Sequence, residues 1–372
     1  MTYIDAFRDK RLGKELARLI ELKATRPMTL MEVCGTHTMA IARHGIKGLL
    51  PPNIKIVSGP GCPVCVTPQS LIDSFIELGK QSGMILATFG DMMRVPGSWS
   101  SLELERASGL DVRVVYSPLD SVKIARENPE KKVVFFGIGF ETTAPAVALA
   151  VLEARSMGLD NFFILSAHKL IPPALEFLAS DSETNIEGFL CPGHVSTIIG
   201  SLAYSRITSD YGIPCVIAGF EPLDILQGIL MLVSQVEEGR AEIETQYSRA
   251  VSQTGNLEAL SCLNSVFQVT DAEWRGLGVI PQSGLEFKSE FSKFDASRLV
   301  PERSFESRRN VQCACGRILK GLLSPTDCPV FGSECTPARP LGPCMVSSEG
   351  ACSAEYRYGR LRGGSGDVDI LW

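Results

Sequence analysis

The cysteines of this chain constrain its fold more than any other feature of the sequence. There are twelve among 372 residues, and six of them fall between Cys313 and Cys352. Structural disulfides are rare in a reducing cytosol, so such crowding favours metal binding or redox chemistry. This Cys-rich segment, residues 313–352, also abounds in glycine and proline and cannot bury much apolar surface. We therefore expect a small, loop-rich unit that a metal centre holds together.

The residue types alone leave two kinds of metal centre open. Four converging thiolates bind either an iron–sulfur cluster or zinc. The irregular intervals between these cysteines do not match a zinc ribbon, and the CxxxCxxC motif of radical enzymes that use S-adenosylmethionine is absent. The spacing favours a [4Fe–4S] cluster, with a zinc-stabilised binding protein as the alternative.

Short apolar runs alternate with helix-like stretches before the Cys-rich segment. Continuous apolar runs of this length are typical of buried parallel strands, so the alternation predicts open α/β sheets. The runs form two successive series, 29–33, 54–58, 84–89 and 112–116, then 133–138, 162–166, 188–190 and 215–218. We expect two Rossmann-like α/β units in tandem.

Four segments follow from this pattern. Residues 1–25 are a candidate amphipathic helix that packs on the last unit, 26–125 and 126–235 are the two α/β units, and 236–372 form the third unit. The third unit is expected to open with a long polar helix after Val236.

Charge and hydropathy exclude several classes of function. The net charge of −6 arises from 42 acidic and 36 basic residues without long runs, so we expect no nucleic acid partner. No apolar stretch approaches the roughly 18 residues of a membrane span, and the first residues are too charged for a secretory signal. We expect a cytoplasmic location and partners that are proteins or small molecules.

A pair of cysteines, Cys62 and Cys65, lies between a predicted strand and a predicted helix in the segment GPGCPVC. Two cysteines separated by two residues at a helix start are close enough to join, and the free N–H groups there favour the thiolate. The motif predicts a redox dithiol. Half of a zinc site is the alternative.

Polar residues follow other predicted strands. Cys34, Thr36 and His37 come at the end of the first, and a thiolate with a nearby imidazole can bind a soft metal or be activated as a nucleophile. A buried packing cysteine is the alternative. Two further strand ends carry groups beside a helix N-terminus that could receive an anion, namely Glu141, Thr142 and Thr143, and His194 and Ser196. Helix capping is the alternative for Thr142 and Ser196, and a structural role is the alternative for His194.

Together these motifs resemble the HypD family. They are MEVCGTHT, GPGCPVCVTP, GFETTAP, PGHVS and the final CxCG…CPVFGxxCTPxxPxGxCMVSxEGxC, in the order found in that family. The match runs from Leu30 to Tyr358. One departure is Met39, where the family often carries a second histidine; Cys34 and His37 remain in place.

The resemblance implies two α/β domains that flank a cleft and a third domain that holds a [4Fe–4S] cluster. The spacing of the family's ligands, carried over here, assigns the cluster to Cys313, Cys328, Cys335 and Cys352. Cys315 is the alternative to Cys313, and Cys344 is left over.

The resemblance also implies a role in the maturation of [NiFe] hydrogenases. The family is thought to pair with a small chaperone, HypC, and to hold Fe(II) while HypE delivers cyanide, before the centre with its cyanide and carbon monoxide ligands reaches the hydrogenase large subunit. Cys34 would supply the thiolate to this iron, and His37 would orient or deprotonate that thiol. Thr36, Glu141, Thr142, Thr143, His194 and Ser196 would line the cleft.

The dithiol of Cys62 and Cys65 would store two electrons, recharged by the cluster as in ferredoxin–thioredoxin reductase, an analogy only. No turnover reaction is assigned to such a scaffold. A free-standing disulfide reductase with the same cluster and dithiol is the alternative. Such a reductase gives no role to Cys34 and His37.

Overall fold

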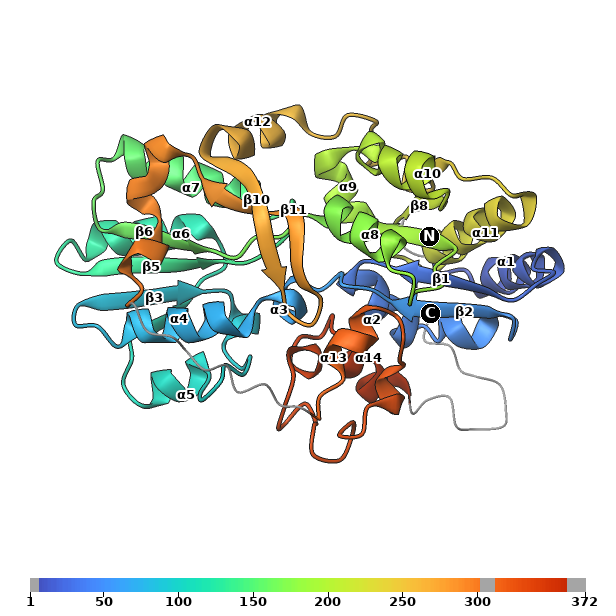
Figure 1. Ribbon diagram of the computed structural model, residues 1–372, viewed down its shortest axis with the longest axis horizontal. Helices are drawn as coiled ribbons and strands as arrows, with labels where there is room; N and C mark the ends of the chain where they lie inside the picture. The colour runs from blue at the N-terminus through green and yellow to red at the C-terminus, as the bar shows by residue number, and fades with distance from the viewer. Residues whose placement is uncertain (1–6, 302–311, 360–372) are drawn as a thin grey trace.

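The computed structural model describes residues 7–301 and 312–359 of the chain. Two parallel sheets with flanking helices lie side by side, and the Cys-rich segment lies at the lower edge of the view in Figure 1. This is the α/β architecture that the alternating apolar runs predict.

The first sheet has five strands in the order β2-β1-β7-β8-β9, and all of its pairs are parallel. The strands are β1 (Met28–Glu32), β2 (Ile54–Ser58), β7 (Gly188–Pro192), β8 (Cys215–Ala218) and β9 (Ile243–Thr245). The helices of this part are α1 (Lys10–Lys23), α2 (Gly35–Arg43), α9 (Gly193–Ile199), α10 (Ser205–Tyr211) and α11 (Pro222–Glu238). Nearly every position of β1, β7 and β8 is buried, which explains why these strands are continuous apolar runs.

The second sheet has four parallel strands in the order β4-β3-β5-β6. The strands are β3 (Met84–Thr88), β4 (Val112–Val114), β5 (Lys132–Gly137) and β6 (Phe162–Ser166). The helices of this part are α4 (Gln69–Gly79), α5 (Leu102–Ala107), α6 (Pro118–Glu127) and α7 (Ala144–Ser156). One apolar core, which includes Phe75, Phe136 and Phe189, extends from this sheet into the first sheet and the Cys-rich segment.

An antiparallel hairpin stands between the two sheets (Figure 1) and reaches the Cys-rich segment with its tip. It consists of β10 (Phe267–Trp274) and β11 (Gly278–Phe287), and α12 (Leu257–Val266) precedes it. At the tip, the N–H of Arg275 donates to the carbonyl of Val66 at 2.8 Å. The remaining helices are α3 (Pro63–Val66), α8 (Ile171–Ser180), α13 (Cys315–Leu319) and α14 (Ala351–Tyr358), with the 3₁₀ turn η8 (Pro343–Met345).

The expected boundary at residue 125 does not separate the two sheets. β1 pairs with β2 on one side and with β7 on the other, in the register Leu30 to Gly188. The chain therefore leaves the first sheet after β2, builds the whole second sheet, and returns at β7. Strand order depends on contacts between distant segments, which the local apolar pattern does not encode.

The predicted placement of the N-terminal helix also differs from the structure. The main partner of α1 is α11 of the first sheet, not the Cys-rich segment. Gly13, Ala17 and Ile20 form the buried stripe of α1, and Lys23 pairs with Glu238 at 2.9 Å. Residues 1–6 of this prediction lie outside the described residues.

The long polar helix expected after Val236 is absent. α11 ends at Glu238, because Gly239 adopts a left-handed conformation with φ of 65°. The following residues form β9, which extends the first sheet, and α12 packs on α7. The residues up to 301 thus contact the sheets, and the separate Cys-rich unit is shorter than the predicted 236–372. Across the described ranges, no helix has the length and apolarity needed to cross a membrane.

Candidate functional site

The carboxyl ends of β1 and β2 bring Cys34 against the loop that carries Cys62. The N–H of Gly35 donates to the carbonyl of Gly61 at 2.9 Å. A Cβ atom at Gly61 would lie 2.3 Å from the backbone nitrogen of Cys34, so only glycine allows this approach. Parallel strands gather their carboxyl ends at one edge of a sheet, where ligands of open α/β proteins bind.

Cys34 is a buried thiol at the N-terminus of α2, with 7% of its surface exposed. Burial raises its pKa to about 12, the carboxyls of Glu349 and Glu32 add to this increase, and the backbone N–H groups of His37 and Thr36 oppose it. The sulfur therefore keeps its proton in this structure. A cation must approach before the thiolate is stable.

The His37 imidazole is held by β8 and by the residue after it. Its Nε2 lies 2.9 Å from the carbonyl of Gly219 and 3.3 Å from that of Ala218. Burial lowers the pKa of His37 to about 4, so the ring is neutral and Nε2 carries the donated proton. Nδ1 is then a bare acceptor with no partner in the described part of the chain. The backbone of His37, rather than its ring, supports the Cys34 sulfur.

Cys62 and Cys65 are joined as a disulfide, with their Cα atoms 5.3 Å apart. Cys62 precedes the short helix α3, and its sulfur accepts from the N–H of Cys65 at 3.3 Å. Both side chains are buried. Helix α3 contacts η8 of the Cys-rich segment, which contains Cys344. The disulfide therefore lies between the Cys34 loop and the Cys-rich segment.

Glu141 and its neighbours lie at the carboxyl end of β5. The Glu141 carboxyl is buried, accepts from the N–H of Ile171 at 2.9 Å and so caps α8; burial raises its pKa to about 7. Thr143 donates its hydroxyl to the carbonyls of Ile138 and Phe140, whereas Thr142 is exposed. Of these three predicted site residues, only Thr142 faces solvent freely.

The PGHVS motif places one exposed and one buried side chain beside the first sheet. The ring of His194 stacks on Phe220 at 3.9 Å between centroids, and Phe220 also lies 5.2 Å from the ring of His37. His194 thus belongs to the same sheet edge as Cys34. Ser196 is buried, donates to the carbonyl of Pro192 and shares a hydrogen bond with Tyr204, so it stabilises the start of α9.

The Cys-rich segment folds around a small cavity of about 10 Å³ that its thiols line. The cysteines in its wall are Cys313, Cys315, Cys328, Cys335 and Cys352. The sulfurs of Cys313 and Cys315 lie 3.3 Å apart. The cavity thus brings together all four predicted ligands and the alternative, Cys315, while Cys344 does not line it.

The residues around this cavity fit an iron–sulfur cluster. A Cβ at Gly342 would lie 2.7 Å from the Cys313 sulfur, so glycine keeps the space open, and the N–H of Leu341 donates to the Cys335 sulfur at 3.3 Å. Burial and the neighbouring thiols raise the pKa of Cys352, so deprotonation requires a compensating cation. Within residues 7–301 and 312–359, no three His, Cys, Asp or Glu side chains form a single-ion site; a cluster instead spreads its ligands over several irons.

Two carboxylates near Cys34 were not indicated by the motif spacing. Glu349 accepts from the hydroxyl of Thr36 at 2.8 Å, although it lies three residues before Cys352 in the sequence. Glu349 therefore connects the Cys-rich segment to the Cys34 loop. The one sequence signal for a role of Glu349 was its position inside the SSEGAC stretch.

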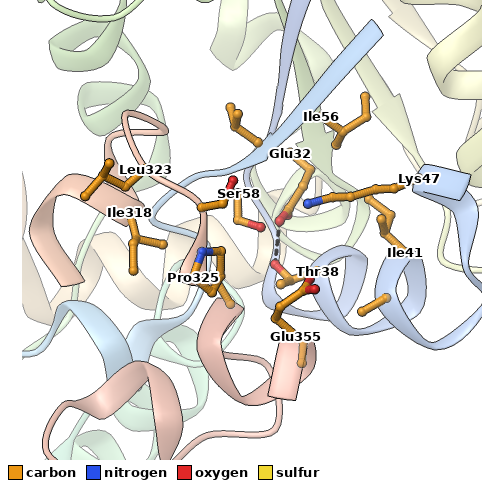
Figure 2. A pocket seen from close by; sticks show the side chains of 15 residues that line it. Glu32, Thr38, Ile41, Lys47, Ile56, Ser58, Ile318, Leu323, Pro325 and Glu355 are labelled. Atoms are coloured by element: carbon orange, nitrogen blue, oxygen red, sulfur yellow. Dashed lines mark hydrogen bonds between the residues drawn. The ribbon is translucent and has the colours of Figure 1, made fainter. Parts of the chain in front are cut away.

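The second carboxylate, Glu32, lies in the wall of a small pocket of about 30 Å³ between α2, β2 and the Cys-rich segment (Figure 2). One oxygen accepts from the N–H of Cys34 at 3.1 Å and the other from the hydroxyl of Thr38. Lys47 extends toward this carboxyl in Figure 2. Burial raises the pKa of Glu32 to about 7. Glu32 thus holds the backbone N–H of Cys34 in place.

Comparison with known proteins confirms the family. The family model described as "HypD: Hydrogenase formation hypA family" matches residues 10–359. Hydrogenase maturation factor HypD of Azotobacter vinelandii is 48% identical over 371 residues, covering 97% of this chain and 98% of its own length. The proteins of the same name from Cupriavidus necator and Escherichia coli are each 46% identical, over 373 and 349 residues, covering 97% and 93% of this chain and 98% and 93% of their own lengths. The chain therefore belongs to the HypD family of hydrogenase maturation factors.

Proposed function

We propose that this chain is a scaffold for the iron centre of a [NiFe] hydrogenase, with Cys34 as the thiolate that receives the iron. The observation that carries the proposal is the convergence of three elements. Gly61 holds the disulfide loop against Cys34, and Glu349 ties the Cys-rich segment to Thr36 in the same loop. A packing cysteine would need none of these contacts.

The surroundings of Cys34 suit a divalent metal as cargo. An incoming Fe(II) replaces the thiol proton, and the N–H groups of Thr36 and His37 stabilise the thiolate that results. The carboxyls of Glu32 and Glu349 offset the charge of the metal. A soft sulfur ligand and the cyanide and carbon monoxide ligands favour the same low-spin ferrous state.

The disulfide of Cys62 and Cys65 is the redox partner of this site. Reduction of its S–S bond takes up two electrons and two protons and gives two thiols, and closure returns them. Cys328, Cys335 and Cys352, with Cys313 or Cys315, would hold a [4Fe–4S] cluster. Such a cluster supplies one-electron transfer when bound.

Maturation requires partners that bring and remove the cargo. A small HypC-type chaperone and a HypE-type cyanide donor would approach the carboxyl edges of the two sheets. His194 and Thr142 are exposed and available for such contacts. The finished centre would pass to the hydrogenase large subunit.

The iron assignment is tested with Cys34→Ala, and with Cys262→Ala as a matched control on α12 away from the site. Each protein is purified without oxygen together with its small partner, and its iron content and infrared spectrum are measured. We expect the control to carry about one iron beyond the four of a cluster, with cyanide and carbon monoxide bands. Cys34→Ala should lose the extra iron and the bands but stay brown. Retention of both would refute the role of Cys34.

The cluster ligands are tested separately. Cys328→Ala and Cys335→Ala should bleach the brown colour and destabilise the Cys-rich segment. Cys313→Ser and Cys315→Ser distinguish the two candidates for the first ligand, because only the true ligand should change the electron paramagnetic resonance spectrum of the reduced protein strongly. A colourless zinc protein would refute the cluster.

A further inference from the structure

Another cavity lies at the carboxyl end of β6 in the second sheet, and none of its lining residues belongs to the iron site proposed above. It has a volume of about 400 Å³, opens to solvent, and is bordered by β6, the β10–β11 hairpin and the start of α4. This size is within the roughly 300–1,000 Å³ of small-molecule sites. Ligands of open α/β sheets bind at this end of the strands.

A lysine without a partner lines this cavity. Lys169 exposes only 4% of its surface, yet no group in the described part of the chain accepts a hydrogen bond from its amine. Burial lowers the pKa of Lys169 to about 8, and the carboxylate of Glu273 partly opposes this. The amine is not among the polar atoms sealed from solvent, so it faces the cavity, where water or a ligand accepts its hydrogen bonds.

The residue beside Lys169 is a neutral histidine, His168. Ser166 uses its one hydroxyl proton to donate to the carbonyl of Leu285 at 3.0 Å, so it must accept from Nδ1–H of His168, also at 3.0 Å. Burial lowers the pKa of His168 to about 3, and its ring is therefore neutral. Nε2 has no partner among the described residues, and it is sealed from solvent, so it does not face the open cavity.

The rim of the cavity limits the charge of a ligand. Asp271, Glu273 and Glu286 are exposed acidic residues in its wall, and Asp295 adds a fourth carboxylate. Four carboxylates against one lysine repel a purely anionic ligand such as a nucleotide. Lys169 in turn repels a purely cationic ligand.

We propose that this cavity binds a free α-amino acid, with its carboxylate on Lys169 and its ammonium group toward the acidic rim. A zwitterion matches the buried cation and the negative rim at once. The site is independent of the iron site, so each proposal can fail without the other.

The proposal is tested by calorimetric titration of the whole, anaerobically purified protein with each of the twenty common amino acids. At least one should bind, and the corresponding amine and α-keto acid, which each lack one pole, should bind about tenfold or more weakly. Lys169→Met should lose binding at an unchanged or raised melting temperature, because methionine removes an uncompensated buried charge. Glu273→Gln should weaken binding, and Glu290→Gln, outside the cavity, should not.

A measurement on the wild-type chain keeps the test independent of folding. With the amino acid in excess over acetic anhydride, which also acetylates free amino acids, the ratio of Lys169 labelling to that of exposed Lys123 should fall, as mass spectrometry reports. The proposal is overturned if none of the amino acids binds, if Lys169→Met binds as well as the wild type, or if labelling of Lys169 is unchanged.

Discussion

Glu141→Gln should stabilise this protein at alkaline pH relative to acidic pH. The Glu141 carboxyl is buried behind β5, with one oxygen bound to the N–H of Ile171 and the other without a partner in the described residues. Glutamine retains the acceptor for Ile171 and cannot ionise. The substitution therefore removes the cost of a buried charge, while its unpaired amide N–H groups add a cost that is the same at both pH values.

The size of this change in the free energy of unfolding follows from the pKa of Glu141, which burial raises from 4.5 to about 7. A raised carboxyl pKa means that the folded protein holds the proton more tightly than the unfolded chain. Stability is therefore lost as the pH rises from 4.5 to about 7 and then levels off. A shift of this size corresponds to about 2 to 3 kcal/mol between pH 5 and pH 8, which the glutamine variant should not lose.

Urea unfolding at pH 5 and pH 8 measures this difference. Trp274 is fully buried and its ring lies 6.1 Å from that of Phe140, so its fluorescence reports on unfolding near Glu141. Glu130→Gln, at an exposed position, is the matched control and should change the free energy of unfolding equally at both pH values. If Glu141→Gln also changes it equally at both, then the buried carboxyl is not costly and the reasoning is wrong.

Three further predictions concern the first sheet. Gly61→Ala should expose Cys34 to faster alkylation, because the new Cβ must displace the backbone of Cys34; an unchanged rate would contradict this. Glu349→Ala should lower the free energy of unfolding by about 1 kcal/mol through loss of the Thr36 hydrogen bond, whereas Glu349→Gln should retain most of it, as urea titration would show. Arg249→Met should cost about 2 kcal/mol, since it leaves the buried Asp224 without its partly exposed cation; equal melting temperatures would refute that.

The strands were predictable because they are buried on both faces. Runs such as 162–166 and 215–218 coincide with β6 and β8, since a parallel strand covered by helices needs mainly apolar residues. The pairing of β1 with β7 was not predictable in this way. Any two such strands present equivalent backbone edges, so their choice of neighbour depends on the packing of the whole molecule.

The candidate site was likewise only partly predictable from the sequence. The sequence placed Cys34 and the Cys62–Cys65 motif at strand ends, because both follow recognisable apolar runs. It gave no sign that Glu141 is a buried cap of α8, since a polar residue after a strand has the same appearance whether it faces solvent or a helix end. It also gave no sign of the lone amine of Lys169, because burial is a property of the neighbours.

Local chemistry was thus determined by the sequence alone: the thiols, their spacing, the strand and helix alternation, and the family to which the motifs belong. Only the tertiary structure decided which of these groups meet. Glu349 reaches Thr36 across more than three hundred residues, and Gly61 fits against Cys34, because the fold brings distant segments into contact. Such contacts arise from the burial of shared apolar surface, which acts without regard to distance along the chain.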